Sequence, residues 1–295
     1  MTTKTSESKI LVPTDFSDVG DSAATHAAAI AKKGGDEVWL LHIITKDTLA
    51  NLKKEKKGIE FLFEKMKILC EDYSKKYGVV FKYQLKEGSI FTTIGEVASE
   101  IGATVMVLGT HGVVGVQKLV GAYALKVVES ATIPVIIVQE KRPVNGEHKV
   151  IVSPIDRSVE TKQKTLQTIT IAKTLGAKVF LYRQKGYDDH LDAEIERNAK
   201  FVVRYLNEHK VTHEVINQDK VSKNFAKDFI AFSKSVSADL IIILTTADKG
   251  IKDIMLGPEE QMVINNEEQI PVMCVKPLQN IYRSERLSSA VNLSF

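Results

Sequence analysis

Cysteine is scarce in this sequence, since Cys70 and Cys274 are the only two among 295 residues and form no C-x-x-C pair. Two cysteines in unrelated contexts suggest neither a disulfide framework nor a zinc site, so we expect packed thiols in a reducing compartment. An excess of charge of one sign is also lacking, because 40 basic and 37 acidic residues leave a net charge of +3. This balance gives no reason to expect a nucleic-acid partner.

Long hydrophobic runs are absent as well. No apolar segment approaches the roughly 20 residues that a membrane-spanning helix requires, and the polar segment Met1–Lys9 has no signal-peptide core. We therefore expect a cytoplasmic protein without a membrane partner. The motifs GxxxxGK[ST], GxGxxG after the first strand and HExxH are missing, and no Ser-His-Asp arrangement is found, so no catalytic residue is nominated.

What the sequence does contain is an internal repeat. Lys9–Asp15 recurs as Lys149–Asp156, and the aspartates that end the two segments are 141 positions apart. Ile133–Val138 recurs as Ile270–Val275, 137 positions later. A chain of 295 residues also suits two domains better than one. We predict a first domain over 1–141, a second over 149–277, and a C-terminal tail over 278–295.

Strands and helices alternate through both halves of the repeat. In the first half we predict strands at 10–12, 37–44, 79–85, 105–108 and 135–138, and helices at 17–33, 53–77, 92–101 and 122–130. In the second half we predict strands at 150–152, 178–182, 212–216, 240–244 and 272–275, and helices at 158–175, 192–208 and 224–235. Apolar strands separated by helices predict two tandem doubly wound, Rossmann-like α/β domains. Each would have a mainly parallel five-stranded sheet with helices on both faces.

Ligands of doubly wound sheets bind outside the carboxyl ends of the strands, where the strand order reverses. The segments that leave the first and fourth strands contain Asp15 and the loop Gly109–Gly121. Glycines allow close approach of the backbone to a ligand, and Gly121 opens a helix whose N–H groups suit a phosphate. Asp15 is placed to accept hydrogen bonds from a ribose or to help hold a metal. Together these features favour a nucleotide site.

Each feature also has a simpler structural interpretation. The glycines can be ordinary turn residues, and Asp15 can be only the N-terminal cap of the following helix. His111 is better explained as a polar loop residue than as a catalyst, and His42 as a packed strand residue than as a ligand. The nucleotide hypothesis depends on the two segments meeting at one crevice.

At these residues the sequence resembles the universal stress protein family in its tandem form. The residues that carry the resemblance are Ile10–Ser17, Val38–Ile43, Val107–Gly112, Gly121 and Ile133–Val138. The resemblance extends through nearly all of residues 8–140 and is weaker over about 149–277. It implies the fold predicted above and a stress-response role.

ATP-binding members of that family carry Gly-x2-Gly-x9-Gly-Ser/Thr, which the first half matches with two departures. The second spacer has eight residues, and Ala122 stands where the hydroxyl residue would be. One lost phosphate hydrogen bond weakens binding roughly 2- to 13-fold, and the neighbouring Tyr123 offers a hydroxyl. The resemblance implies ATP, with Mg²⁺ as a candidate companion, at Pro13, Thr14, Asp15, Ile43, Leu108, Gly109, His111, Gly112, Gly121, Ala122 and Tyr123. The backbone of Ile43 would read the base.

The second half departs further from the motif. Leu244 and Ala247 replace its first two glycines, and Pro258 follows Gly257 without a backbone N–H for a phosphate. We interpret this half as a degenerate partner that supplies structure. Family members pair through the edge strand at the end of the domain, so the resemblance implies an internal pseudo-dimer through Val135–Val138 and Val272–Val275. A further homodimer of tandem chains stays open.

Three functions fit these features. The first is an adenine-nucleotide-binding protein of stress response or signalling, with the nucleotide in the first half. The second is a slow Mg²⁺-dependent ATPase, against which the lack of a general base or arginine finger argues. The third is a scaffold that binds no nucleotide, in which Ala122 and the short spacer mark a lost site.

Overall fold

The structure of the chain is a computed structural model. It describes residues 8–110, 122–139, 148–158, 160–245 and 256–277. Among these residues no helix is both long and apolar enough to cross a membrane. Residues 142–147, between the two predicted domains, and the C-terminal tail lie outside the described residues.

The first half contains five strands and five helices within the described residues. In chain order they are β1 (Lys9–Pro13), α1 (Asp18–Gly34), β2 (Glu37–Ile44), α2 (Lys46–Lys54), α3 (Glu60–Tyr77), β3 (Phe81–Glu87), α4 (Thr93–Ile101), β4 (Val105–Thr110), α5 (Ala122–Ser130) and β5 (Val135–Gln139). The second half continues with β6 (Val150–Ile155), α6 (Thr161–Leu175), β7 (Lys178–Arg183), α7 (Asp189–Glu208), β8 (His213–Asn217), α8 (Phe225–Ser235), β9 (Leu240–Leu244), α9 (Pro258–Ile264) and β10 (Val272–Val275).

One predicted helix was wrong in its extent. The segment expected to be a single helix over 53–77 is divided between α2 and α3, and the chain between them turns at Lys56, which has a φ of 56°. The sequence pattern missed α2 because Leu52 is its one buried residue, which leaves no apolar stripe to detect. It also missed the short helix α9, which begins at Pro258.

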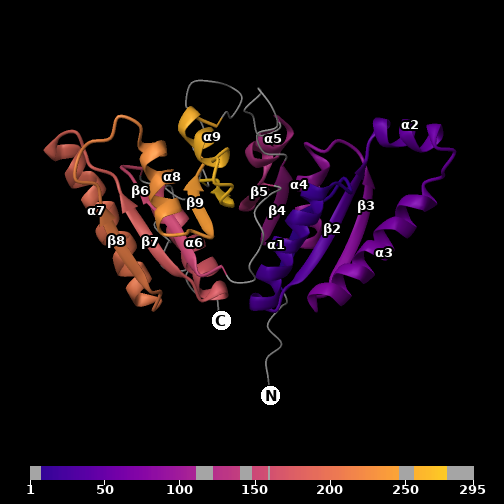
Figure 1. The fold of residues 1–295 in the computed structure, drawn as a ribbon, viewed down its shortest axis with the longest axis horizontal. Coiled ribbons are helices and arrows are strands. Elements are labelled where there is room, and N and C mark those ends of the chain that lie inside the picture. The colour runs from indigo at the N-terminus through magenta and orange to yellow at the C-terminus, as the bar shows by residue number, and fades with distance from the viewer. Residues whose placement is uncertain (1–7, 111–121, 140–147, 159, 246–255, 278–295) are drawn as a thin grey trace, which may run out of the picture.

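All ten strands form one sheet in the order β3-β2-β1-β4-β5-β10-β9-β6-β7-β8. Neighbouring strands within each half run parallel. β5 and β10 pair antiparallel at the centre, with Met273 opposite Ile136. The two halves therefore repeat one strand order on either side of this central pair, as Figure 1 shows.

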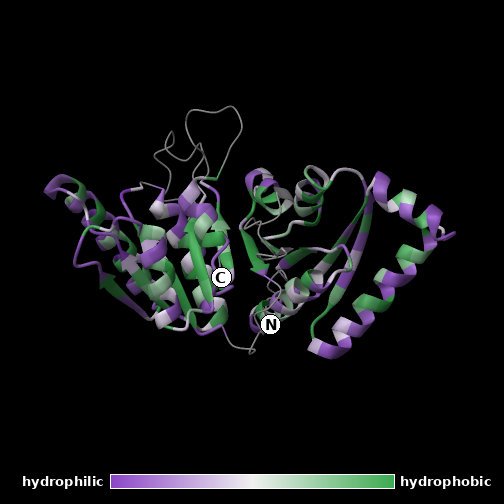
Figure 2. Cartoon of the chain, turned by 45° about the horizontal axis from the view of Figure 1, so that its top comes forward, coloured by the Kyte–Doolittle hydropathy of each residue, from purple (hydrophilic) through white to green (hydrophobic). Residues whose placement is uncertain are grey.

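Two apolar layers cover the faces of the sheet, and each layer continues across both halves. One packs α1, α3, α6 and α7 against one face, and its largest fully buried side chains include Ile10, Leu40 and Met66. The other packs α4, α5, α8 and α9 against the opposite face, around Leu11, Met106 and Phe229. Figure 2 shows the resulting pattern of apolar strands between helices that alternate in hydropathy. This fold class agrees with the one predicted from the alternation of elements.

Candidate functional site

A cavity of about 370 Å³ lies at the carboxyl ends of β1, β2 and β4. The strand order reverses here, because β1 has β2 on one side and β4 on the other. The volume is within the range usual for small-molecule sites. Its lining comprises Pro13, Thr14, Asp15, Val19, Gly20, Leu41, His42, Ile43, Thr45, Thr48, Ile90, Ile94, Leu108, Gly109, Thr110, Ala124 and Val127.

The structure brings six of the eleven predicted site residues together around this cavity. They are Pro13, Thr14, Asp15, Ile43, Leu108 and Gly109. Ala122 and Tyr123 form the first turn of α5, but their side chains lie outside what the structure describes. His111, Gly112 and Gly121 lie outside the described residues, so their place at the site stays a prediction.

Gly109 has a packing requirement in addition to the role predicted for it. A Cβ atom at this position would lie 2.2 Å from the carbonyl oxygen of Val19, which belongs to α1. The absence of a side chain therefore allows α1 to approach β4. Close approach of this backbone to a ligand stays a prediction, because a glycine after a strand fits both explanations.

The loop after β1 is held by its own polar side chains. Oδ1 of Asp15 accepts a hydrogen bond from the backbone N–H of Ser17 at 3.1 Å and another from its hydroxyl. Phe16 has a φ of 66°, and its N–H donates to Oγ1 of Thr14 at 3.1 Å. Asp15 therefore holds the turn that precedes α1, but it is not the N-terminal cap of this helix, a position that Ser17 occupies. Its exposed side chain also borders the cavity.

The backbone of Ile43 presents a donor and an acceptor where β1 ends. Backbone groups of alternate residues in a strand point to opposite sides. Leu41 faces β1, since its carbonyl accepts from Thr14 N–H at 2.8 Å, whereas the Ile44 carbonyl accepts from Gly88 N–H beyond β3. Ile43 faces the β1 side like Leu41, but the β1–β2 pairing ends at Pro13. Within the described part of the chain, its N–H and C=O have no backbone partner.

His42 is a packed strand residue, as predicted, but it also borders the same cavity. It is buried, its Nδ1 lies 2.8 Å from the carbonyl oxygen of Thr14, and its ring lies 4.5 Å from the ring of Phe16. Burial lowers the pKa of this imidazole, while the Thr14 carbonyl and Asp15 oppose that shift. Its Nε2 has no hydrogen-bond partner among the described residues. We infer a neutral ring that carries its proton on Nδ1.

Thr45 and Thr48 were also missed, because α2 was not predicted. Their hydroxyl oxygens form a capping box in which each accepts from the other residue's backbone N–H at 3.2 Å. The two oxygens lie 3.1 Å apart, so one hydroxyl proton is used between them. The second hydroxyl proton remains for an acceptor on a ligand.

Charged groups are few on the cavity wall. Asp15 is the one carboxylate among the described lining residues, and none of them is lysine or arginine. No group of three or more His, Cys, Asp or Glu side chains that could hold a metal occurs in the described parts of the chain. Among the described residues, backbone groups such as those at the start of α5 are the candidates to hold an anion here.

At the equivalent positions of the second half, aromatic side chains replace aliphatic ones. The strand registers match Leu41 with Tyr182, which pair with Pro13 and Pro154 respectively. Ile90 and Ile94 precede β4 by the same number of residues as Phe225 and Phe229 precede β9. The rings of Tyr182, Phe225 and Phe229 lie about 6 Å apart from one another, at 5.8, 5.9 and 6.0 Å. Large rings thus occupy space beside the strand ends of this half.

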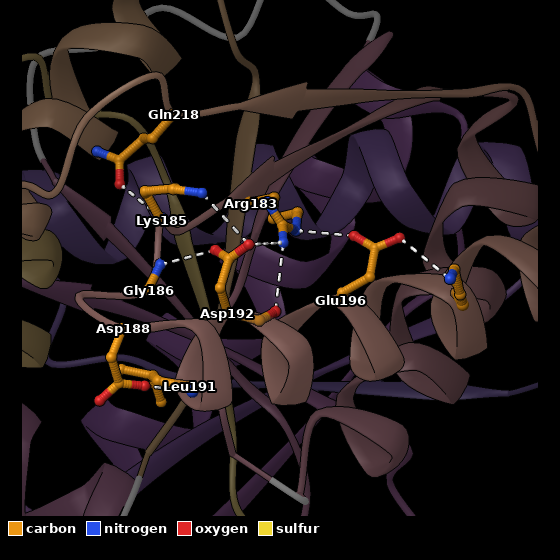
Figure 3. Close-up of polar contacts among 9 residues, drawn as sticks. Arg183, Lys185, Gly186, Asp188, Leu191, Asp192, Glu196 and Gln218 are labelled. Carbon is orange, nitrogen blue, oxygen red and sulfur yellow. Dashed lines mark hydrogen bonds and ion pairs between the residues drawn. The ribbon is translucent and has the colours of Figure 1, made fainter.

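An ion-pair network closes the connection between β7 and α7, as Figure 3 shows. The buried Arg183, at the position of His42 in the first half, lies 3.0 Å from Asp192 and 3.2 Å from Glu196. Asp192 also accepts from Gly186 N–H at 2.9 Å. This backbone hydrogen bond, followed by the Arg183 guanidinium, lowers the pKa of Asp192 to about 2.

A buried amine marks a third difference between the halves. Lys164 of α6 occupies the position that Ala23 has in α1, and its Nζ donates to the Pro154 carbonyl. Burial lowers the pKa of Lys164 to about 8, against the opposing effect of Asp156. A long polar side chain therefore lies against the end of β6, where the first half has a methyl group.

The model of the universal stress protein family matches residues 7–139 of the chain. A universal stress protein of Methanocaldococcus jannaschii is 32% identical over 142 residues, which are 45% of this chain and 83% of that protein. A second one from the same organism is 27% identical over 154 residues, covering 45% of this chain and 95% of its own length. The crystal structure of a universal stress protein from Archaeoglobus fulgidus superposes with a TM-score of 0.73. The superposition covers 92% of this chain and 98% of that one, at 16% sequence identity. The similarity of fold therefore extends over both halves of the chain.

Proposed function

The chain belongs to the universal stress protein family, and from that premise we propose that its first half binds an adenine nucleotide, with ATP as the leading candidate. The proposed role is in stress response or signalling. One observation carries the proposal: the N–H and C=O of Ile43 point toward the β1 side of the cavity, where β1 has ended.

This backbone pair matches one edge of adenine. The ring nitrogen N1 is an acceptor and the N6 amino group is a donor, so an adenine can accept from the Ile43 N–H and donate to its C=O. Hypoxanthine and guanine carry the reverse pattern, a donor at N1 and an acceptor at O6. The apolar walls formed by Leu41, Ile94 and Leu108 suit a flat base.

The remaining parts of a nucleotide have candidate partners nearby. Asp15 has an exposed carboxylate on the cavity wall that can accept from ribose hydroxyls. The N-terminus of α5, which begins at Ala122, would face the phosphates together with Gly109, Gly112 and Gly121. We propose Mg²⁺ as a companion of the phosphates rather than as a resident ion of the protein.

The second half would act as a built-in partner of the first, forming an internal pseudo-dimer. The antiparallel pair of β5 and β10 supports this role, since it leaves neither strand with an open edge. The last residue of β5 and the residue that follows β10 also reach across to the other half. Gln139 donates to the carbonyls of Ile264 and Asn266 at 3.1 and 3.3 Å, and Lys276 donates to that of Glu129 at 2.7 Å. Each half thus caps the last helix of the other.

We also propose the cytoplasm as the place of action. Both cysteines are free and buried, and burial raises the pKa of Cys70 to about 12 and that of Cys274 as well. The thiols are therefore held as neutral packing groups, which fits a reducing compartment.

Calorimetric titration of the full chain with ATP–Mg²⁺ and with ITP–Mg²⁺ tests the nucleotide proposal. We expect one saturable site per chain and a clear preference for ATP. Asp15→Asn should weaken ATP binding about 2- to 13-fold, the effect of one hydrogen bond. Asp156→Asn changes the equivalent turn-forming residue of the second half and should leave the affinity unchanged.

Equal binding of ITP and ATP would show that Ile43 does not read the base. Absence of saturable binding at millimolar nucleotide, with a cooperative unfolding transition confirming the fold, would favour the scaffold function instead. Two sites per chain would mean that the second half also binds nucleotide.

A further inference from the structure

One hydrogen bond differs between the two halves at the place where the first strand ends. In the second half the carbonyl oxygen of Ile155 accepts from the backbone N–H of Gln184 at 3.0 Å. This bond extends the β6–β7 pairing to Ile155, one residue beyond Pro154. The strand registers match Ile155 with Thr14 and Gln184 with Ile43.

In the first half the equivalent carbonyl has a different donor. The oxygen of Thr14 lies 2.8 Å from Nδ1 of His42, and the β1–β2 pairing ends at Pro13. No backbone hydrogen bond joins Ile43 N–H to Thr14 within the described residues. The imidazole therefore takes the carbonyl that would otherwise accept from the Ile43 N–H.

The geometry of His42 suits this substitution. A carbonyl oxygen can only accept, so Nδ1 carries the proton. The contact of the ring with Phe16, at 4.5 Å between centroids, holds the imidazole in place beside the loop. Arg183 cannot act in this way at the same position of the second half, because its guanidinium is directed to Asp192 and Glu196.

We propose that His42 is a positioning residue. By donating to the Thr14 carbonyl oxygen, it prevents this oxygen from accepting a hydrogen bond of the β1–β2 ladder. The Ile43 N–H is thereby left to donate to a ring nitrogen of the bound base. This inference rests on the proposed function for its ligand, whereas the exchange of hydrogen-bond donors concerns the protein alone. The second half shows the alternative arrangement, in which Arg183 occupies the position of His42 and the ladder closes.

Three variants separate the positioning role from general damage. His42→Leu removes the donor and should allow the Thr14 carbonyl to bind the Ile43 N–H. His42→Asn should restore the donor, because the asparagine Nδ2 can take the place of the imidazole Nδ1. His213→Leu is the matched control, since its Nδ1 also lies 2.9 Å from a backbone carbonyl, that of Val211, at the far edge of the sheet.

Nucleotide binding is measured with ATP and with 1-deaza-ATP, in which a C–H replaces the acceptor N1. The wild type and His42→Asn should prefer ATP. His42→Leu should bind ATP about 2- to 13-fold more weakly and lose its preference over 1-deaza-ATP. His213→Leu should behave as the wild type does. Retention of the full preference in His42→Leu would overturn the proposal.

Amide hydrogen exchange of the nucleotide-free protein tests the same bond without a ligand. The Ile43 amide should exchange rapidly in the wild type, and on the order of 10-fold or more slowly in His42→Leu. Equal exchange in the two proteins would overturn the positioning role. If the wild type binds no nucleotide, the proposed function fails, and the exchange measurement still decides whether His42 keeps the Ile43 N–H open.

Discussion

At the carboxyl ends of the strands, the first half places Leu41, Ile90 and Ile94 around a cavity. The second half places Tyr182, Phe225 and Phe229 at the equivalent positions, with their rings in contact. Both halves keep the same strand order, so the difference lies in side chains rather than in topology. A doubly wound sheet supplies a place for a ligand at the strand reversal, but the residues that line this place decide whether space is left.

The backbone hydrogen bonds at the strand ends also differ between the two halves. The second half completes its ladder through the hydrogen bond from Gln184 to Ile155 and closes the following loop with the Arg183 ion pairs. The first half ends its ladder one residue earlier and has α2 after β2. Backbone groups that complete the ladder in the second half therefore have no backbone partner at Ile43 in the described part of the first half.

Filling the cavity should have the largest effect on function. The double substitution Ile90→Phe and Ile94→Phe gives the first half the residues of the second, and the rings should occupy the space of the base. We expect loss of detectable ATP binding in calorimetry together with a folded protein by circular dichroism. Retained binding would show that the base lies elsewhere. Leu166→Phe, at an exposed position of α6, is the control.

Removing a ring from the second half should have the largest effect on stability. Phe229 is 1% exposed and contacts two other aromatic rings, so Phe229→Ala should lower the free energy of unfolding by about 3–5 kcal/mol. The measurement is urea denaturation at pH 7. The ATP affinity at urea concentrations below the transition should stay unchanged. If the variant gained a second nucleotide site, the aromatic rings alone would be what prevents nucleotide binding in the second half.

Lys164 should make stability depend on pH at the alkaline end. Its pKa is lowered to about 8 in the folded protein, from an ordinary value of 10.5. The unfolded chain therefore binds more protons between these values, so the free energy of unfolding should rise as the pH increases from about 8 to 10.5. Lys164→Met should remove this slope in denaturation curves collected across the window. Identical slopes in the two proteins would contradict a buried amine.

Asp192 should give a smaller effect at acid pH. Its pKa is lowered to about 2 from 3.8, so the stabilisation is present above 3.8 and is lost as the pH falls toward 2. Asp192→Asn should flatten this part of the acid-unfolding curve. Its ATP affinity at pH 7 should equal that of the wild type, since the network belongs to the second half. A change in affinity would mean that the two halves are coupled at this loop.

The sequence predicted most of the fold because its strands have a strong local pattern. β2 and β9 have the bounds that the alternation of elements predicts, and Asp15, Ile43 and Gly109 do meet at one cavity. The prediction failed where burial is weak, since α2 buries one side chain. It was incomplete at Gly109, which borders the cavity and also gives α1 room against β4. Both outcomes depend on neighbours that are distant in sequence.

The sequence by itself determined the order of the strands and of the amphipathic helices, the repeat and the family resemblance, because periodicity and motifs are local properties of the chain. Only the tertiary structure decided that the Thr14 carbonyl accepts from the His42 side chain, whereas the Ile155 carbonyl accepts from the backbone N–H of Gln184. The physical reason is that β1 and β2 meet through contacts between residues about 28 positions apart, such as Thr14 and His42. At such a meeting point, one side chain can replace a backbone donor without altering the strand pattern that the sequence displays.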